Sequence, residues 1–179
     1  MSHLIRSASL WLVAIFAAAL LPNTAAQADS LTEDSVKAGF VFNFTKYVEW
    51  PKAKAGNGLL VCSLSTQTLS GKLESLQGRQ VQGREIRVST TTRPGEWRNC
   101  AVLFIAAAEA QHIDAVLRAT AQHHVLTISD APGFVQAGGI IGLKLRAGRI
   151  AFDINHGAAR QAGLNLSSQL LKLADEVLP

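Results

Sequence analysis

The chain has 179 residues, of which 48% are hydrophobic and 17% are charged, and its formal net charge is +4. A chain of this size can bury a core without help from a metal ion. The Lys and Arg residues are spread along the sequence, and no cluster is dense enough to follow a phosphate backbone. Composition and charge therefore argue against nucleic acid as a partner.

The first segment, residues 1–28, has the three-part pattern of a secretory signal peptide. Arg6 gives a positive start, an apolar run follows, and Ala26 and Ala28 supply small residues for a signal peptidase. The apolar run is shorter than the roughly 20 residues of a membrane-spanning helix, and an uncleaved anchor is the alternative. We therefore expect export by a cleaved signal peptide and a single soluble domain over residues 29–179.

Two cysteines, Cys62 and Cys100, remain after cleavage. An even number of cysteines in an oxidising compartment predicts a disulfide, and the alternative is two separate buried thiols. Closing this loop would stabilise the fold by about 4 kcal/mol in the chain-entropy model. The spacing differs from Cys-x-x-Cys, so a thioredoxin-like redox motif is excluded.

A helix is predicted at the start of the mature chain. Ser30 and Glu33 form a capping box, and apolar residues at helical spacing continue to about Glu49, before Pro51. The later elements alternate in type. Strands are expected at residues 59–64, 84–91, 101–105 and 125–129, and helices around residues 69–76 and 113–120.

The last part of the sequence predicts a β-hairpin over residues 141–154, because apolar and polar residues alternate on both sides of Ala147-Gly148. A short helix is expected at residues 157–162. A final helix is expected to begin after Ser167 or Ser168, with apolar spacing that continues to Leu178.

The alternation of strands and helices predicts right-handed βαβ units and a mostly parallel sheet with helices on both faces. The hairpin near the end makes the sheet mixed. A bridge between Cys62 and Cys100 requires Cα atoms within about 7 Å, so the first and third strands should be neighbours. This favours the 2-1-3 strand order of a three-layer, flavodoxin-like α/β fold.

Motifs for catalysis and metal binding are missing from the sequence. The first and third strands end without the acidic residues that hold a divalent cation in receiver domains. The histidines lack metal-ligand spacing, and no nucleophile elbow or glycine-rich phosphate loop occurs. We therefore expect no catalytic residue, metal or cofactor, and an enzyme is the least favoured class.

One loop has the composition of a ligand site. Asp130 follows a predicted strand at the edge where open α/β sheets bind ligands, and Phe134 lies four residues later. Asp130 could orient a ligand amine or hydroxyl, and Phe134 could stack on a ring. The alternative is an Asp-Pro-Gly turn with Phe134 packed beneath it.

Aromatic residues gather in the first helix. Five of the nine that remain after cleavage lie between positions 40 and 50. Phe40, Phe44 and Tyr47 fit one apolar face, whereas Phe42 lies about half a turn away and Trp50 falls at the helix end. Either this helix is buried on two sides, or Phe42 and Trp50 contact a partner.

Four segments resemble the YfiR family, the DUF4154 domain. They are VKAGFVFNFTKYVEWP (residues 36–51), LQGRQVQG (residues 76–83), TISDAPGF (residues 127–134), and NHGAARQAGL (residues 155–164) leading into SQLLKL (residues 168–173). The segments occur in order over nearly the whole mature chain.

The resemblance implies a periplasmic, non-enzymatic repressor that binds the periplasmic part of an inner-membrane diguanylate cyclase and lowers cyclic-di-GMP. An outer-membrane lipoprotein with a peptidoglycan-binding domain sequesters such repressors, and family members form dimers. Cys62 and Cys100 match the family's structural pair, whereas a second pair near the hairpin of some relatives is absent here. The alternative is a periplasmic small-ligand sensor serving another membrane receptor, with Asp130 and Phe134 in its pocket.

Overall fold

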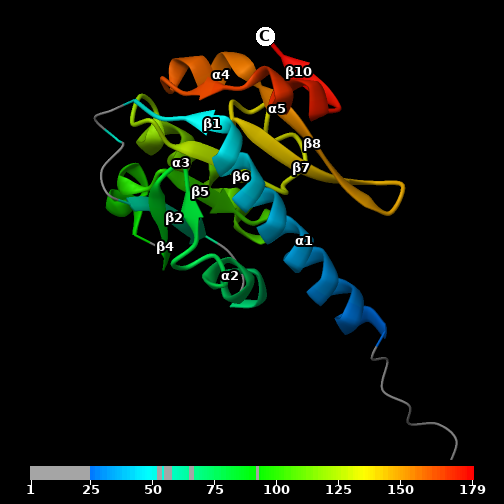
Figure 1. Cartoon of the computed structure of the whole chain (residues 1–179). Coiled ribbons are helices and arrows are strands. Elements are labelled where there is room, and N and C mark those ends of the chain that lie inside the picture. Colours follow the sequence, from blue (N-terminus) through cyan, green and yellow to red (C-terminus); the bar gives the residue numbers. More distant parts are fainter. Residues whose placement is uncertain (1–24, 52–53, 55–57, 65–66, 92) are drawn as a thin grey trace, which may run out of the picture.

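Within the described part of the chain, an eight-stranded mixed sheet forms the centre of the fold (Figure 1). The computed structural model describes residues 25–179 apart from 52–53, 55–57, 65–66 and 92. Most of the expected signal peptide, residues 1–28, lies outside the described residues. Of the helices described, none combines the length and apolarity that a membrane crossing requires.

The sheet order confirms the predicted neighbours. Across the sheet the strands are β10 (Glu176–Leu178), β8 (Arg149–Asn155), β7 (Ile141–Arg146), β6 (Leu126–Ser129), β5 (Val102–Ile105), β2 (Gly58–Leu64), β4 (Arg84–Thr90) and β3 (Gln80–Val81). The five strands from β4 to β7 pair in parallel, whereas the β7–β8 hairpin and the β3–β4 pair are antiparallel. The predicted 2-1-3 order is therefore present as β4-β2-β5.

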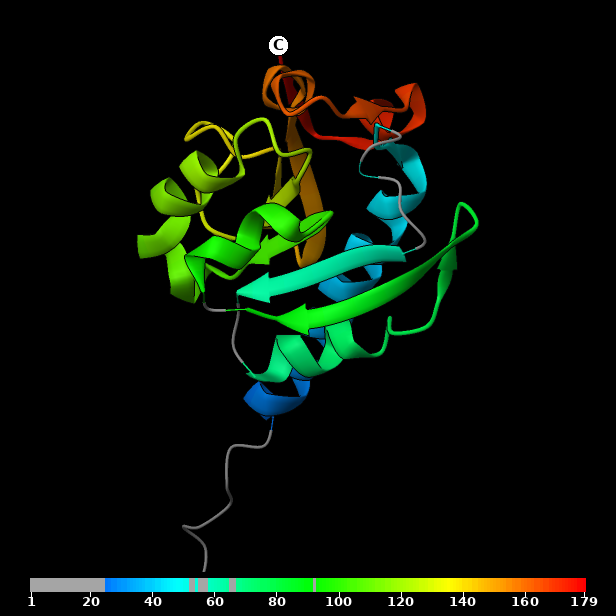
Figure 2. The ribbon, with the colours of Figure 1, turned by 90° about the vertical axis from the view of Figure 1, so that its left-hand side faces the viewer.

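Helices cover both faces of the sheet and give the three predicted layers. The helical segments are α1 (Ala25–Tyr47), α2 (Gln67–Glu74), α3 (Ile113–Thr120), α4 (His156–Gln161) and α5 (Ser168–Leu173), with 3-10 turns η2 (Pro94–Asn99) and η3 (Ala107–His112). Figure 2 shows β2 and β4 between α2 on one side and η2 on the other. Because both faces are covered, β5 is apolar at every position.

The alternation of side chains along β5 divides the core in two. Val102 and Phe104 belong to the larger cluster, which includes residues of α1 and α2, whereas Leu103 and Ile105 belong to the cluster with α3 and η2. The disulfide lies in the second cluster. Cys62 and Cys100 are bonded, their Cα atoms are 5.9 Å apart, and both residues are buried. The predicted disulfide is confirmed.

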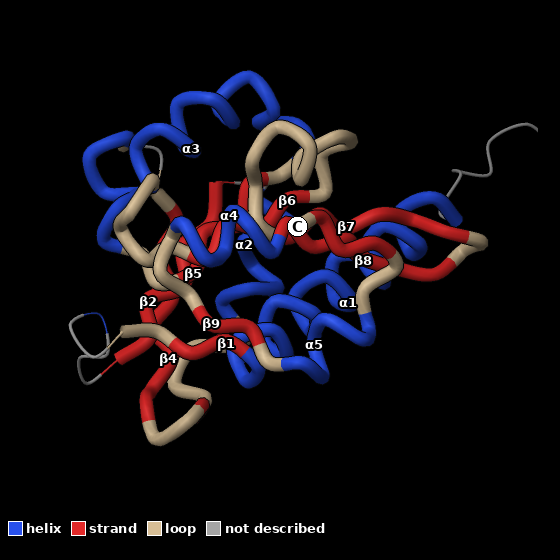
Figure 3. Tube along the Cα trace, turned by 90° about the horizontal axis from the view of Figure 1, so that it is seen from above, coloured by secondary structure: helices blue, strands red, loops and turns tan. Residues whose placement is uncertain are grey.

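The ends of α1 differ from the prediction. The helix begins at Ala25, so Ser30 lies within it rather than at its N-terminus. It ends at Tyr47 because Val48–Glu49 form a strand, β1, that pairs antiparallel with β9 (Asn165–Leu166), as Figure 3 shows. A partner strand from far along the chain therefore ends the helix before Pro51.

The prediction of a long final helix is wrong. Ser167 caps α5 as expected, with its hydroxyl accepting from the Leu170 backbone N–H, but α5 ends at Leu173. The last residues form β10, which pairs in parallel with β8. Leu173 and Val177 are 65% and 41% exposed. These two apolar side chains are therefore not packed against the core, and the burial that would stabilise a longer helix is missing.

Candidate functional site

Asp130 binds groups of its own chain. One carboxylate oxygen accepts a hydrogen bond from Lys37 Nζ on α1 at 2.6 Å, and the other accepts from the Ala107 backbone N–H at 2.6 Å. Lys37 also pairs with Glu33, at 2.7 Å. Burial opposes the charge of Lys37, but the bonds to Asp130 and Glu33 outweigh it and raise the pKa of Lys37 above its ordinary value. Asp130 therefore fastens α1 to the carboxyl edge of the sheet.

Phe134 is packed into the core. Its side chain is 2% exposed and lies against Gly139, where any Cβ atom would collide with the ring. A cavity of about 210 Å³ beside α1 is lined by Asp130 but not by Phe134. Asp130 and Phe134 therefore do not line this cavity together, and the burial of Phe134 favours the alternative of a turn with Phe134 packed beneath it.

Phe42 and Trp50 are both covered by their own chain. Each is 8% exposed and belongs to the larger core cluster. The Arg79 guanidinium lies 3.7 Å from the centre of the Phe42 ring, and Lys46 Nζ lies 4.4 Å from the same ring. The Trp50 indole N–H donates to the Ala101 carbonyl at 3.2 Å. Burial on two sides therefore explains why α1 carries so many aromatic residues.

Cations form the outer layer over these rings. Besides Arg79 and Lys46, the Arg84 guanidinium lies 5.1 Å from the Trp50 ring. We call Lys46, Arg79 and Arg84 the cationic surface. The ion pairs of the described residues involve other side chains, so these three cations have no carboxylate partner in that part of the chain. Attraction between a cation and an aromatic ring holds the layer in place.

The β3–β4 turn positions the cationic surface. Its Gln82 side chain donates to the Lys46 and Val48 carbonyls at 3.1 and 3.2 Å, which ties the turn to the end of α1. Burial lowers the pKa of Arg84, and its Nη1 atom is buried without a hydrogen-bond partner in the described structure. The cationic surface therefore combines an exposed Lys and Arg with a partly desolvated Arg.

An apolar groove runs between α1 and the tip of the β7–β8 hairpin. Its volume is about 570 Å³, and its apolar lining is Val36, Phe40, Leu145 and Ile150. Val36 and Leu145 are 41% and 63% exposed, respectively. Periodicity places Val36 and Phe40 on one helix face, but the hairpin that forms the other wall lies more than 100 residues later in the sequence.

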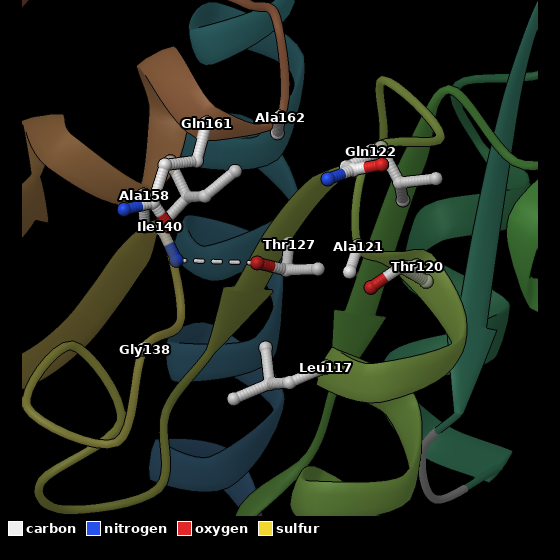
Figure 4. Close-up of a pocket in the computed structure, with 11 residues that line it drawn as sticks. Leu117, Thr120, Ala121, Gln122, Thr127, Gly138, Ile140, Ala158, Gln161 and Ala162 are labelled. Carbon is white, nitrogen blue, oxygen red and sulfur yellow. Dashed lines mark hydrogen bonds between the residues drawn. The ribbon is translucent and has the colours of Figure 1, made fainter.

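A further cavity lies between α3, β6 and α4, with Thr127 near its centre (Figure 4). Sequence reasoning did not identify it, because its lining comes from four separate segments and contains no chemical motif. In the described residues, no three side chains of His, Cys, Asp or Glu come together to hold a metal ion.

The described residues thus form a disulfide-braced α/β domain with a cationic surface and an apolar groove. Comparison with protein families assigns the domain to a family. The YfiR/HmsC-like profile (DUF4154) matches residues 34–175, so the chain belongs to this family. The family consists of periplasmic regulators in cyclic-di-GMP signalling.

Solved structures resemble the chain at low sequence identity. A conserved domain protein from Vibrio cholerae matches with a TM-score of 0.52 and 13% identity, over 80% of this chain and 60% of that one. The ABC domain in complex with L-Trp from Streptococcus pneumonia gives a TM-score of 0.48 and 12% identity, over 68% of this chain and 56% of that one. This chain thus spans less than two thirds of either structure.

Proposed function

We propose that this protein represses an inner-membrane diguanylate cyclase by binding the cyclase's periplasmic part, and so lowers cyclic-di-GMP. The observation that carries the proposal is the cationic surface, where Lys46, Arg79 and Arg84 lie over Phe42 and Trp50 without carboxylate partners in the described residues. A surface of this kind suits an acidic segment of a partner, because opposite charges steer association and fix its register.

The regulation follows from competition between partners. An outer-membrane lipoprotein with a peptidoglycan-binding domain would bind the same protein and withdraw it from the cyclase. Such a partner withdraws the protein when its own free concentration, relative to its Kd, exceeds that of the cyclase. The regulator itself then needs no catalytic group.

The contact is tested by cross-linking in the periplasm of the living cell. A membrane-impermeant cross-linker applied to cells with the natural protein should capture a membrane protein with a diguanylate cyclase domain, identified by mass spectrometry. The double variant Lys46→Glu/Arg79→Glu reverses two exposed charges and should lose most of this product. Both side chains are exposed, so we expect the variant to fold.

Arg118→Glu is the matched control, because Arg118 is exposed on α3, on the other face of the sheet. It should retain the cross-link. Equal capture by the natural protein and the double variant would refute the assignment of the cationic surface. Failure of the natural protein to capture any cyclase would refute the proposed function.

We also propose that the protein forms a homodimer through the apolar groove between α1 and the hairpin. Exposed Val36 and Leu145 favour a covered surface, and Glu33 and Arg149 line the same groove with opposite charges. In a two-fold contact each patch meets itself, so an acidic and a basic wall complement each other.

Sedimentation velocity tests the dimer directly. Leu145→Arg should shift the protein to monomer, whereas Leu173→Arg, at an equally exposed leucine on α5, should not. A dimer that persists in Leu145→Arg would place the interface elsewhere.

A further inference from the structure

We propose that the cavity between α3, β6 and α4 binds a small uncharged molecule that carries a hydrogen-bond acceptor. The cavity has a volume of about 460 Å³, within the range of natural small-molecule pockets. It is distinct from the cationic surface and from the apolar groove, and the inference does not depend on the proposed repression.

The lining determines the class of ligand. None of the eleven residues around the cavity is ionisable. Leu117, Val125 and Ile140 give it apolar walls. A charged ligand would give up part of its hydration there without meeting an opposite charge, whereas a neutral ligand would gain from burial of apolar surface.

Thr127 offers a buried donor at the centre of the cavity. Its side-chain oxygen accepts a hydrogen bond from the Ile140 backbone N–H at 3.1 Å, drawn as a dashed line in Figure 4. The residue is 2% exposed, and among the described residues its side chain takes part in this one hydrogen bond, in which the hydroxyl oxygen accepts and its proton is not used. A buried donor without a partner is unfavourable, so an acceptor on the ligand would be bound with a net gain.

Two glutamines add adjustable polar contacts at the rim. Gln161 comes from α4 and Gln122 from the turn between α3 and β6, on opposite sides of Thr127 (Figure 4). Both side chains are exposed, and neither amide has a hydrogen-bond partner among the residues described. An amide donates and accepts, so the pair suits a ligand such as a carboxamide.

The walls are held in place without a ligand. Asn155 fixes the start of α4, accepting from the Ala158 backbone N–H at 2.8 Å and donating to the Val135 carbonyl at 2.9 Å. His124 fixes its end, with Nδ1 2.8 Å from the Ala162 carbonyl, which requires a proton on that nitrogen. A preformed site loses less conformational entropy on binding.

The turn that carries Gln122 is strained. Gln122 and His124 have φ angles of 61° and 56°, in the left-handed region that non-glycine residues seldom occupy. Strain of this kind persists where surrounding contacts fix the backbone, and it is concentrated at functional sites. Here the His124 bond to α4 supplies the contact that maintains the turn.

Benzamide and benzoate test the proposal, because they share ring and size and differ in charge. In NMR titrations of the ¹⁵N-labelled protein, benzamide should saturably shift the Ile140 backbone amide and the side-chain amides of Gln122 and Gln161. Benzoate should bind at least about tenfold more weakly, since it brings an unpaired charge into the cavity.

Variants show whether the binding uses this cavity. Gln161→Ala should weaken benzamide binding by about threefold to tenfold, the value of one hydrogen bond. Gln169→Ala removes an equally exposed helical glutamine on α5 and should leave the affinity unchanged. Absence of benzamide shifts at these amides, equal binding of benzoate, or equal affinity of Gln161→Ala and the natural protein would overturn the proposal.

Discussion

Reduction of the disulfide should lower the free energy of unfolding by about 4 kcal/mol. Cys62 lies in β2, Cys100 precedes β5, and 38 positions separate them along the chain. In the chain-entropy model a closed loop of that length removes roughly 13 cal/mol/K from the unfolded chain, which is roughly 3.9 kcal/mol at 25 °C. Both residues are at most 2% exposed, so the reduced thiols would remain packed in the same core and the cross-link alone changes.

Urea unfolding of the oxidised and reduced protein, followed by circular dichroism, measures the difference. The double variant Cys62→Ala/Cys100→Ala is the control, and reductant should not alter its unfolding curve. A loss below about 1 kcal/mol in the natural protein would show that the cross-link does little to restrict the unfolded chain, and would refute the reasoning.

The other predictions concern contacts that position α1 and α4. Asp130→Asn should destabilise the protein by about 2 kcal/mol, because Lys37 loses its charged partner. Because the pKa of Lys37 is raised in the folded state, this stabilisation should be complete below pH 10.5 and should disappear as the pH rises through the raised pKa. Urea unfolding of the natural protein and of Asp130→Asn across that pH range measures the difference in their free energies of unfolding. A difference that stays constant with pH would contradict the prediction. Gly163→Ala should lower the melting temperature in thermal unfolding, because Gly163 has a φ of 71° and a Cβ atom would lie 2.7 Å from His124 Nδ1. Gly71→Ala on α2 meets no atom within 4 Å and should not destabilise; equal melting temperatures for the two variants would argue against the strain.

The order of the central strands in the sheet could be predicted from the sequence. The continuous apolar run of β5 requires burial on both faces, and the cysteine pair fixes β2 beside β5. The short strands β1, β9 and β10 could not be predicted, because each has only two or three residues and forms by pairing with a strand that is distant in the sequence. Periodicity alone therefore extended both terminal helices too far.

The candidate site shows the same limit. Phe42 falls outside the apolar face of α1. The periodicity of apolar residues predicts which side chains of a helix are buried by apolar contacts, but it does not predict cover by a cation. The contact of Arg79, from a distant turn, with the Phe42 ring could therefore not be predicted. Likewise Asp130 has the composition of a ligand residue, but its partner Lys37 lies 93 positions earlier. In both cases a long cationic side chain, distant in the sequence, contacts a residue for which the sequence shows no partner.

The most direct test of the central claim is the intracellular concentration of cyclic-di-GMP in the natural host. Deletion of this gene should raise the concentration, and the natural protein supplied from a plasmid should restore it. The Lys46→Glu/Arg79→Glu variant, exported at an equal level, should fail to restore it. An unchanged concentration after deletion would contradict repression of a cyclase by this protein.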